Sequence, residues 1–166
     1  MQRSRSREGT RTRTDARHGW KIRVAFAGLV SASALSACVG PATTFPVYEA
    51  KAVVSVEQAS SAVQTVRVAA SQALADRNFA PYLSETMHDA EEDVTTAEGH
   101  FSSIQPPDAR SEALRSQAKE LLTRASDAVE RARIAMRAGD AAALSRLSPT
   151  LADLVSALNA FVNEHR

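Results

Sequence analysis

Apolar and small residues recur at alternating steps of three and four residues along most of the chain beyond residue 50. This spacing lines one face of an α-helix. Four runs keep it, and they extend from Ala52 to Ala73, from Leu83 to Ile104, from Leu114 to Met136 and from Leu144 to Val162. No stretch of comparable length alternates with a period of two, so the sequence predicts four amphipathic helices and no strand.

Helix-breaking and capping residues separate the four runs. Pro81 suits the first position of a helix, and Pro106 with the proline after it stops one. Gly139 and Asp140 combine a C-terminal glycine with the next N-cap, whereas Pro149 predicts a kink or a restart inside the fourth run. The predicted helices are 47–77, 81–105, 108–138 and 141–165, with a break near 148–149. Their short connections favour an all-α fold, an antiparallel up-and-down four-helix bundle over residues 47–166.

Alanine lines most of the first and third runs, whereas leucine dominates the fourth. An alanine side chain forfeits much of the roughly 1.5–3 kcal/mol that burying a larger aliphatic side chain contributes. Either the first and third helices approach closely, or the bundle is only modestly stable. We therefore expect the fourth helix to carry a large share of the core, and its removal from Leu151 onward to unfold the domain.

The first 23 residues are strongly basic, with a net charge of +6. No charged residue then occurs from Val24 to Tyr48, and the part up to Ala37 is apolar and rich in small residues. A basic, then apolar, then small-residue order is typical of a secretory signal peptide. The alternative is an uncleaved membrane span, but serine, glycine, threonine and proline dilute the stretch, and a span needs about 20 predominantly apolar residues.

The segment Leu35-Ser36-Ala37-Cys38 consists of an aliphatic residue, two small residues and a cysteine. It resembles the lipobox of bacterial lipoproteins. The resemblance implies that a diacylglycerol thioether forms on Cys38 and that signal cleavage occurs between Ala37 and Cys38. The expected organisation is a signal peptide over residues 1–37, a lipidated cysteine with a flexible tether over residues 38–46, and the bundle. The protein is then anchored by lipid at the extracytoplasmic face of the cell membrane, because two acyl chains give stable attachment.

Cys38 is the only cysteine, so no disulfide forms within the chain, and lipidation accounts for a lone thiol in an exported protein. Residues 38–166 carry a net charge of −5 without a basic stripe, which argues against a nucleic-acid partner. The sequence contains no glycine-rich phosphate loop, nucleophile elbow or zinc-spaced set of histidines and cysteines. We therefore expect a non-enzymatic protein without a cofactor.

The densest polar cluster lies in the second predicted helix. Glu85 and His88 have the Glu-x-x-His spacing that places a carboxylate and an imidazole on one helical face in di-iron bundles, and Asp89 and Glu92 extend the cluster. Di-iron bundles need this motif twice and pointing inward, whereas a core-facing Met87 turns these side chains outward. A solvated acidic face is the favoured interpretation, and weak divalent-metal binding is the alternative.

Branched apolar residues also occur away from the predicted core face of the first helix. Val54 and Val68 fall on its far side, and Val53 lies at its shoulder. They are candidates for a surface that contacts an envelope protein or a second copy, the alternative being ordinary scattered valines. These patterns favour a lipid-anchored, non-enzymatic interaction module of the cell envelope. A solute- or metal-binding lipoprotein with its site on or between the helices is the alternative function.

Overall fold

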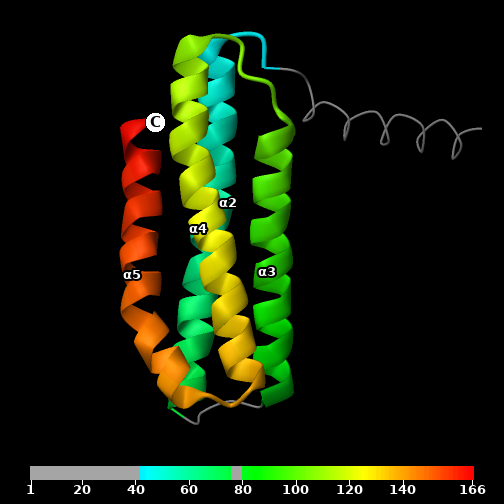
Figure 1. Ribbon diagram of the computed structural model, residues 1–166, viewed down its shortest axis with the longest axis vertical. Coiled ribbons are helices and arrows are strands. Elements are labelled where there is room, and N and C mark those ends of the chain that lie inside the picture. The colour runs from blue at the N-terminus through cyan, green and yellow to red at the C-terminus, as the bar shows by residue number, and fades with distance from the viewer. Residues whose placement is uncertain (1–41, 76–79) are drawn as a thin grey trace, which may run out of the picture. The chain divides into compact units, whose positions relative to one another are not determined.

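The computed structural model describes residues 42–75 and 80–166. These residues form the helices α2 (Phe45–Leu74), α3 (Ala80–Ser103), α4 (Ala109–Arg137) and α5 (Ala141–Glu164), and they contain no strand. Consecutive helices run in opposite directions, so this part of the chain is an up-and-down four-helix bundle (Figure 1). The predicted fold class is confirmed.

The predicted signal peptide and its cleavage site, Ala37 and Cys38, lie outside the described residues. Among the helices that the structure does describe, none combines the length and the apolar character that crossing a membrane requires. The bundle is a compact unit of its own from Pro41 to Arg166.

The first helix starts earlier than the sequence predicts. α2 begins at Phe45, with Thr44 in an extended N-cap conformation and Pro46 in the first turn, where a proline costs no hydrogen bond. The guanidinium of Arg110 on α4 lies 3.7 Å from the centre of the Phe45 ring, and Ala42 is already buried. The tether predicted to extend to residue 46 is therefore wrong at its end, because residues 45 and 46 already belong to α2.

Of the kink or restart predicted near 148–149, the structure shows the kink. α5 continues from Ala141 to Glu164 with Pro149 inside it, and Figure 1 shows its lower, orange part inclined to the rest. Proline removes the N–H that would bond to the carbonyl of Ser145, four residues earlier. Ser145 and Pro149 are both exposed, so solvent can reach the freed carbonyl and the helix bends without ending.

The helices are not arranged as a square. α2 and α4 each contact all three other helices, whereas α3 and α5 share no contact within the described residues. In Figure 1 α2 and α4 lie between α3 and α5. Both central helices bury many alanines, namely Ala52, Ala59, Ala62, Ala69 and Ala70 on α2 and Ala118, Ala125, Ala128, Ala132 and Ala135 on α4. Small side chains let two helix backbones approach, so we expect α2 and α4 to pack closely.

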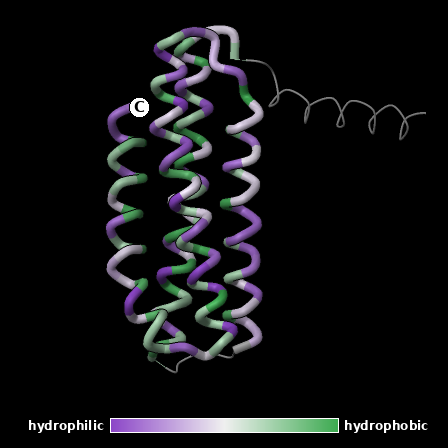
Figure 2. The backbone as a smooth tube through the Cα atoms, viewed as in Figure 1, coloured by the Kyte–Doolittle hydropathy of each residue, from purple (hydrophilic) through white to green (hydrophobic). Residues whose placement is uncertain are grey.

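Larger side chains from the outer helices complete the core. Met87 and Phe101 of α3 and Leu151 and Leu158 of α5 are fully buried, as the sequence predicts. Figure 2 shows the hydrophobic positions of α5 on the side that faces α2 and α4. Tyr48 is an unpredicted member: it is fully buried, and its ring centre lies 5.5 Å from that of Phe101.

Ala125→Leu is expected to destabilise the bundle by about 1–3 kcal/mol, because overpacking a filled core forces helices apart. Ala125 is fully buried on α4, the helix that packs against α2. Ala113→Leu makes the same chemical change on the exposed side of the same helix and should leave stability nearly unchanged. Chemical denaturation followed by circular dichroism measures both variants. Equal stability of the two would contradict close packing of the central helices.

Candidate functional site

The acidic cluster on α3 does not form an enclosed site. Glu85, His88, Asp89 and Glu92 are all exposed. Nowhere in residues 42–75 and 80–166 do three or more histidine, cysteine, aspartate or glutamate side chains come together in a way that could hold a metal ion. The neighbouring Glu91 has a structural contact instead, with its Oε2 atom 2.6 Å from Nε of Arg133 on α4. The structure therefore offers no observation in favour of the metal-binding alternative.

The three candidate valines of the first helix have different environments. Val54 and Val68 are 52% and 56% exposed, as a contact surface requires. Val53 is only 7% exposed and belongs to the hydrophobic core, so its assignment to the contact surface is wrong. The physical reason is that three helices surround α2, which buries a wider sector than a single apolar stripe.

Val54 and Val68 belong to a longer exposed stripe. We define the α2 outer face as the exposed residues Val47, Ala50, Val54, Gln58, Ser61, Gln64, Thr65 and Val68. Steps of three and four residues place them on one side of the helix. These exposed residues are uncharged, whereas exposed positions of α3 and α4 carry many acidic and basic side chains. Glu57 lies at the same spacing, between Val54 and Ser61, and its charge is paired with that of Arg166.

A groove between α2 and α3 borders one edge of this face. It has a volume of about 500 Å³, and its lining residues are Ser61, Gln64, Thr65, Val68, Ala69, Gln72, Tyr82, Leu83 and Thr86. All of them are uncharged. Tyr82 is 65% exposed, so an aromatic ring is available beside Val68. The volume is in the range of small-molecule sites, which makes this groove the place where a solute would lie under the alternative function.

A second groove, between α2 and α5, borders the other edge. Its volume is about 410 Å³. The hydroxyl of Ser60 donates to Oδ1 of Asn159 at 2.8 Å, and Nε2 of Gln64 donates to that hydroxyl at 3.2 Å. Glu57 and Arg166, which also line the groove, form an ion pair. Their charges compensate each other, so the surface stays electrically neutral on this side too.

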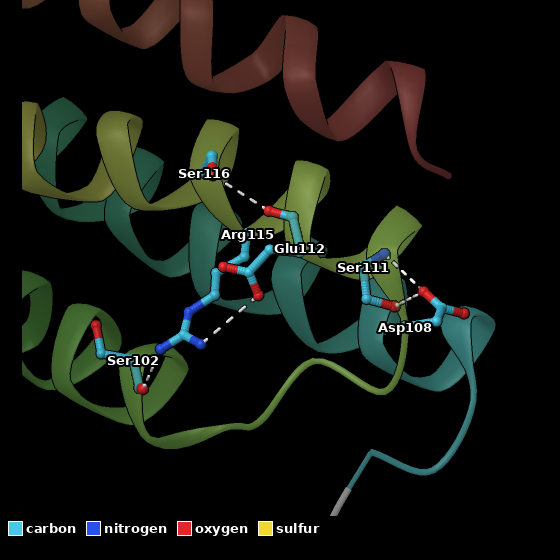
Figure 3. A network of polar contacts seen from close by, with 6 residues as sticks. All are labelled: Ser102, Asp108, Ser111, Glu112, Arg115 and Ser116. Carbon is cyan, nitrogen blue, oxygen red and sulfur yellow. Dashed lines mark hydrogen bonds and ion pairs between the residues drawn. The ribbon is translucent and has the colours of Figure 1, made fainter.

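The most connected polar network serves the fold and not the α2 outer face. Figure 3 shows it at the junction of α3 and α4, where one Asp108 oxygen accepts from both the backbone N–H and the hydroxyl of Ser111, each at 2.7 Å. Arg115 donates to the carbonyl of Ser102 at 3.3 Å and lies 4.0 Å from Glu112. These contacts cap α4 and hold the end of α3 to it.

Asp108→Ala is expected to lower the melting temperature at pH 7 by removing this cap. The backbone N–H of Ser111, and then its hydroxyl, lower the pKa of Asp108 below its ordinary value of 3.8. Because the pKa of Asp108 is lower in the folded state, its ionised carboxylate stabilises the fold above pH 3.8. This stabilisation is lost as the pH falls through the pKa that Asp108 has in the folded state. In thermal melts from pH 7 to pH 2, the melting temperatures of Asp108→Ala and of the parent protein should therefore approach each other below pH 3.8.

Asp108→Asn is the matched control, because it keeps an acceptor at the cap without a titrating carboxyl. The melting temperature of Asp108→Asn should differ from that of Asp108→Ala by a nearly constant amount over the same pH range. If the melting temperatures of the parent protein and Asp108→Ala differed by the same amount at every pH, the ionised carboxylate would not be what stabilises the cap.

Sequence patterns indicated part of the α2 outer face but neither groove. Val54 and Val68 stood out because branched apolar residues interrupt a polar helix face. Tyr82 carried no such signal, since its place beside Val68 depends on how α3 packs against α2. Comparison of the chain with protein-family models, with curated proteins and with solved structures gives no match.

Proposed function

We propose that the chain is a lipid-anchored, non-enzymatic lipoprotein of the cell envelope that binds a protein through the α2 outer face. The observation that carries the binding part is the exposure of three large apolar side chains, Val47, Val54 and Val68, among uncharged neighbours on one side of α2. Covering charged groups costs desolvation free energy, and the centres of protein interfaces are depleted in them. Neutral serine, threonine and glutamine side chains on the same stripe supply hydrogen bonds for such a contact.

The anchoring part of the proposal follows from the lipobox resemblance at Cys38. Six residues separate Cys38 from the first residue of α2, and they reach at most about 22 Å. A lipidated Cys38 would hold the start of α2 close to the membrane surface. The α2 outer face is then presented to proteins of the envelope and not to the cytoplasm.

Site-specific crosslinking in the native cell tests the binding surface. Photoreactive residues at positions 54 and 68 should each capture a discrete partner, because both side chains are more than half exposed on the α2 outer face. A photoreactive residue at position 92, on the exposed acidic side of α3, is the matched control and should capture none. Equal crosslinking at all three positions, or none at any, would contradict an interface on α2.

A further inference from the structure

We propose that the groove between α2 and α3 is a binding site for a neutral saccharide, with the ring of Tyr82 as its aromatic contact. This inference goes beyond the proposed function, because it assigns a small ligand to the groove and not a protein to the α2 outer face. It is carried by the uncharged lining of the groove, by the direction of the hydrogen bonds there and by the exposed tyrosine ring.

The lining of the groove is polar but uncharged. Hydroxyl and amide side chains make up most of it, namely Ser61, Gln64, Thr65, Gln72, Tyr82 and Thr86. An ionic ligand would lose hydration in the groove without gaining a counter-charge from its lining. A hydrocarbon ligand would cover these hydroxyl and amide groups without forming hydrogen bonds to them. The lining therefore favours a ligand that is neutral and rich in hydrogen-bonding groups.

Two threonine hydroxyls, one on each wall of the groove, already use their protons. Oγ1 of Thr65 on α2 donates to the carbonyl of Ser61 at 3.1 Å, and Oγ1 of Thr86 on α3 donates to the carbonyl of Tyr82 at 3.0 Å. A hydroxyl that donates its one proton to the backbone keeps lone pairs that accept from a ligand. Both walls thus present acceptors, and the hydroxyl groups of a sugar supply the matching donors.

Tyr82 supplies the apolar surface against which a sugar ring packs. Its side chain is 65% exposed, and the exposed Val68 lines the groove from α2. The C–H groups on one face of a pyranose ring form a flat apolar surface that fits an aromatic ring. Small-molecule sites likewise combine aromatic contacts with a few polar groups that fix the orientation of the ligand. An exposed ring beside uncharged acceptors therefore fits a saccharide better than a purely polar or a purely apolar ligand.

The walls of the groove are held in place before any ligand binds. Ala69 of α2 and Leu83 of α3 line the groove but are buried in the hydrophobic core, so they fix the two helices relative to each other. The bonds of Thr65 and Thr86 to their own helices hold both hydroxyls in one orientation. A site that is ordered in advance loses less entropy on binding.

Saturation-transfer NMR on the full-length chain tests the site. The protein is kept in a detergent without a sugar headgroup, because such a headgroup would compete for the groove. The two probes are cellobiose, which offers hydroxyl groups alone, and N,N′-diacetylchitobiose, which adds acetamido groups. At least one should bind with a dissociation constant on the order of 1 mM, because an open groove makes few contacts. The probe that binds more tightly identifies the kind of saccharide, and binding of neither overturns the proposal.

Substitutions on α3 show whether the probe lies in the groove. Tyr82→Ala should weaken binding at least about tenfold, whereas Tyr82→Phe keeps the ring and should stay within about twofold of the parent protein. Thr86→Val removes an acceptor at nearly constant shape and should weaken binding severalfold. Thr96→Val is the matched control, because it makes the same change at an exposed position of α3 outside the groove. Binding that survives Tyr82→Ala, or that falls equally in Thr96→Val, would overturn the proposal.

Failure of this inference can be distinguished from failure of the proposed function. Tyr82 and Thr86 belong to α3, so their variants leave the α2 outer face unchanged. If positions 54 and 68 capture a protein in the cell while neither saccharide binds, the groove assignment is wrong and the protein-binding surface stands. If a saccharide binds and depends on Tyr82 while positions 54 and 68 capture nothing, the groove assignment stands and the proposed protein contact is wrong.

Discussion

Removal of residues 151–166 is expected to abolish the cooperative unfolding transition of the domain. The deleted segment carries six large buried side chains, Leu151, Leu154, Val155, Leu158, Phe161 and Val162. Burying them contributes roughly 9–18 kcal/mol, which matches or exceeds the whole stability of a typical domain, about 5–15 kcal/mol. The loss also exposes the alanine-rich sides of α2 and α4 that α5 covers. Thermal melts followed by circular dichroism at 222 nm measure the transition.

Deletion of residues 163–166 alone is the matched control. It removes the contact between His165 Nδ1 and Glu49 Oε1 at 3.0 Å and the ion pair of Arg166 with Glu57. Pairs near the surface contribute about 0–1 kcal/mol each, so this shorter deletion should melt cooperatively at a slightly lower temperature. A cooperative melt after removal of residues 151–166 would contradict the share of the core that we assign to α5.

Cys38→Ser is expected to leave the protein as an unlipidated precursor that retains the first 37 residues. The lipobox resemblance requires a sulfur atom for the diacylglycerol thioether and places cleavage after that modification. Labelling with a radioactive fatty acid should therefore fall to background, and the mass of the intact protein should remain that of the full sequence. The fatty-acid labelling and the mass are both measured on the protein expressed in its native cell.

Ser36→Ala keeps a small residue at its lipobox position and serves as the control for this change. It should be labelled and cleaved like the parent protein. A Cys38→Ser variant with the mature mass would refute the assignment of Cys38. An uncleaved precursor in the parent protein itself would favour the membrane-span alternative for the apolar segment.

Local features of the sequence were sufficient to predict the helices and most of the core. Met87, Phe101, Leu151 and Leu158 are buried as their spacing predicts, because the period of a helix is set by the backbone. The N-cap at Asp140 was also predicted, since capping depends on residues within one turn. The interpretation of Cys38 came entirely from the sequence, and it stays a prediction because this residue lies outside the described structure.

Features that depend on neighbouring helices could not be predicted from the order of residues. Val53 is buried because α2 is enclosed on three sides, and Tyr82 lies beside Val68 because α3 packs there. The sequence predicted a kink or a restart at Pro149, and only the structure shows that α5 continues through it, with buried residues on both sides. The sequence by itself thus determined the helical periodicity, the capping of the helices and the candidate anchor, all of which depend on residues close together in the chain. Only the tertiary structure decided which helices are central and which surface of α2 stays uncovered, because these follow from contacts between residues far apart in the chain.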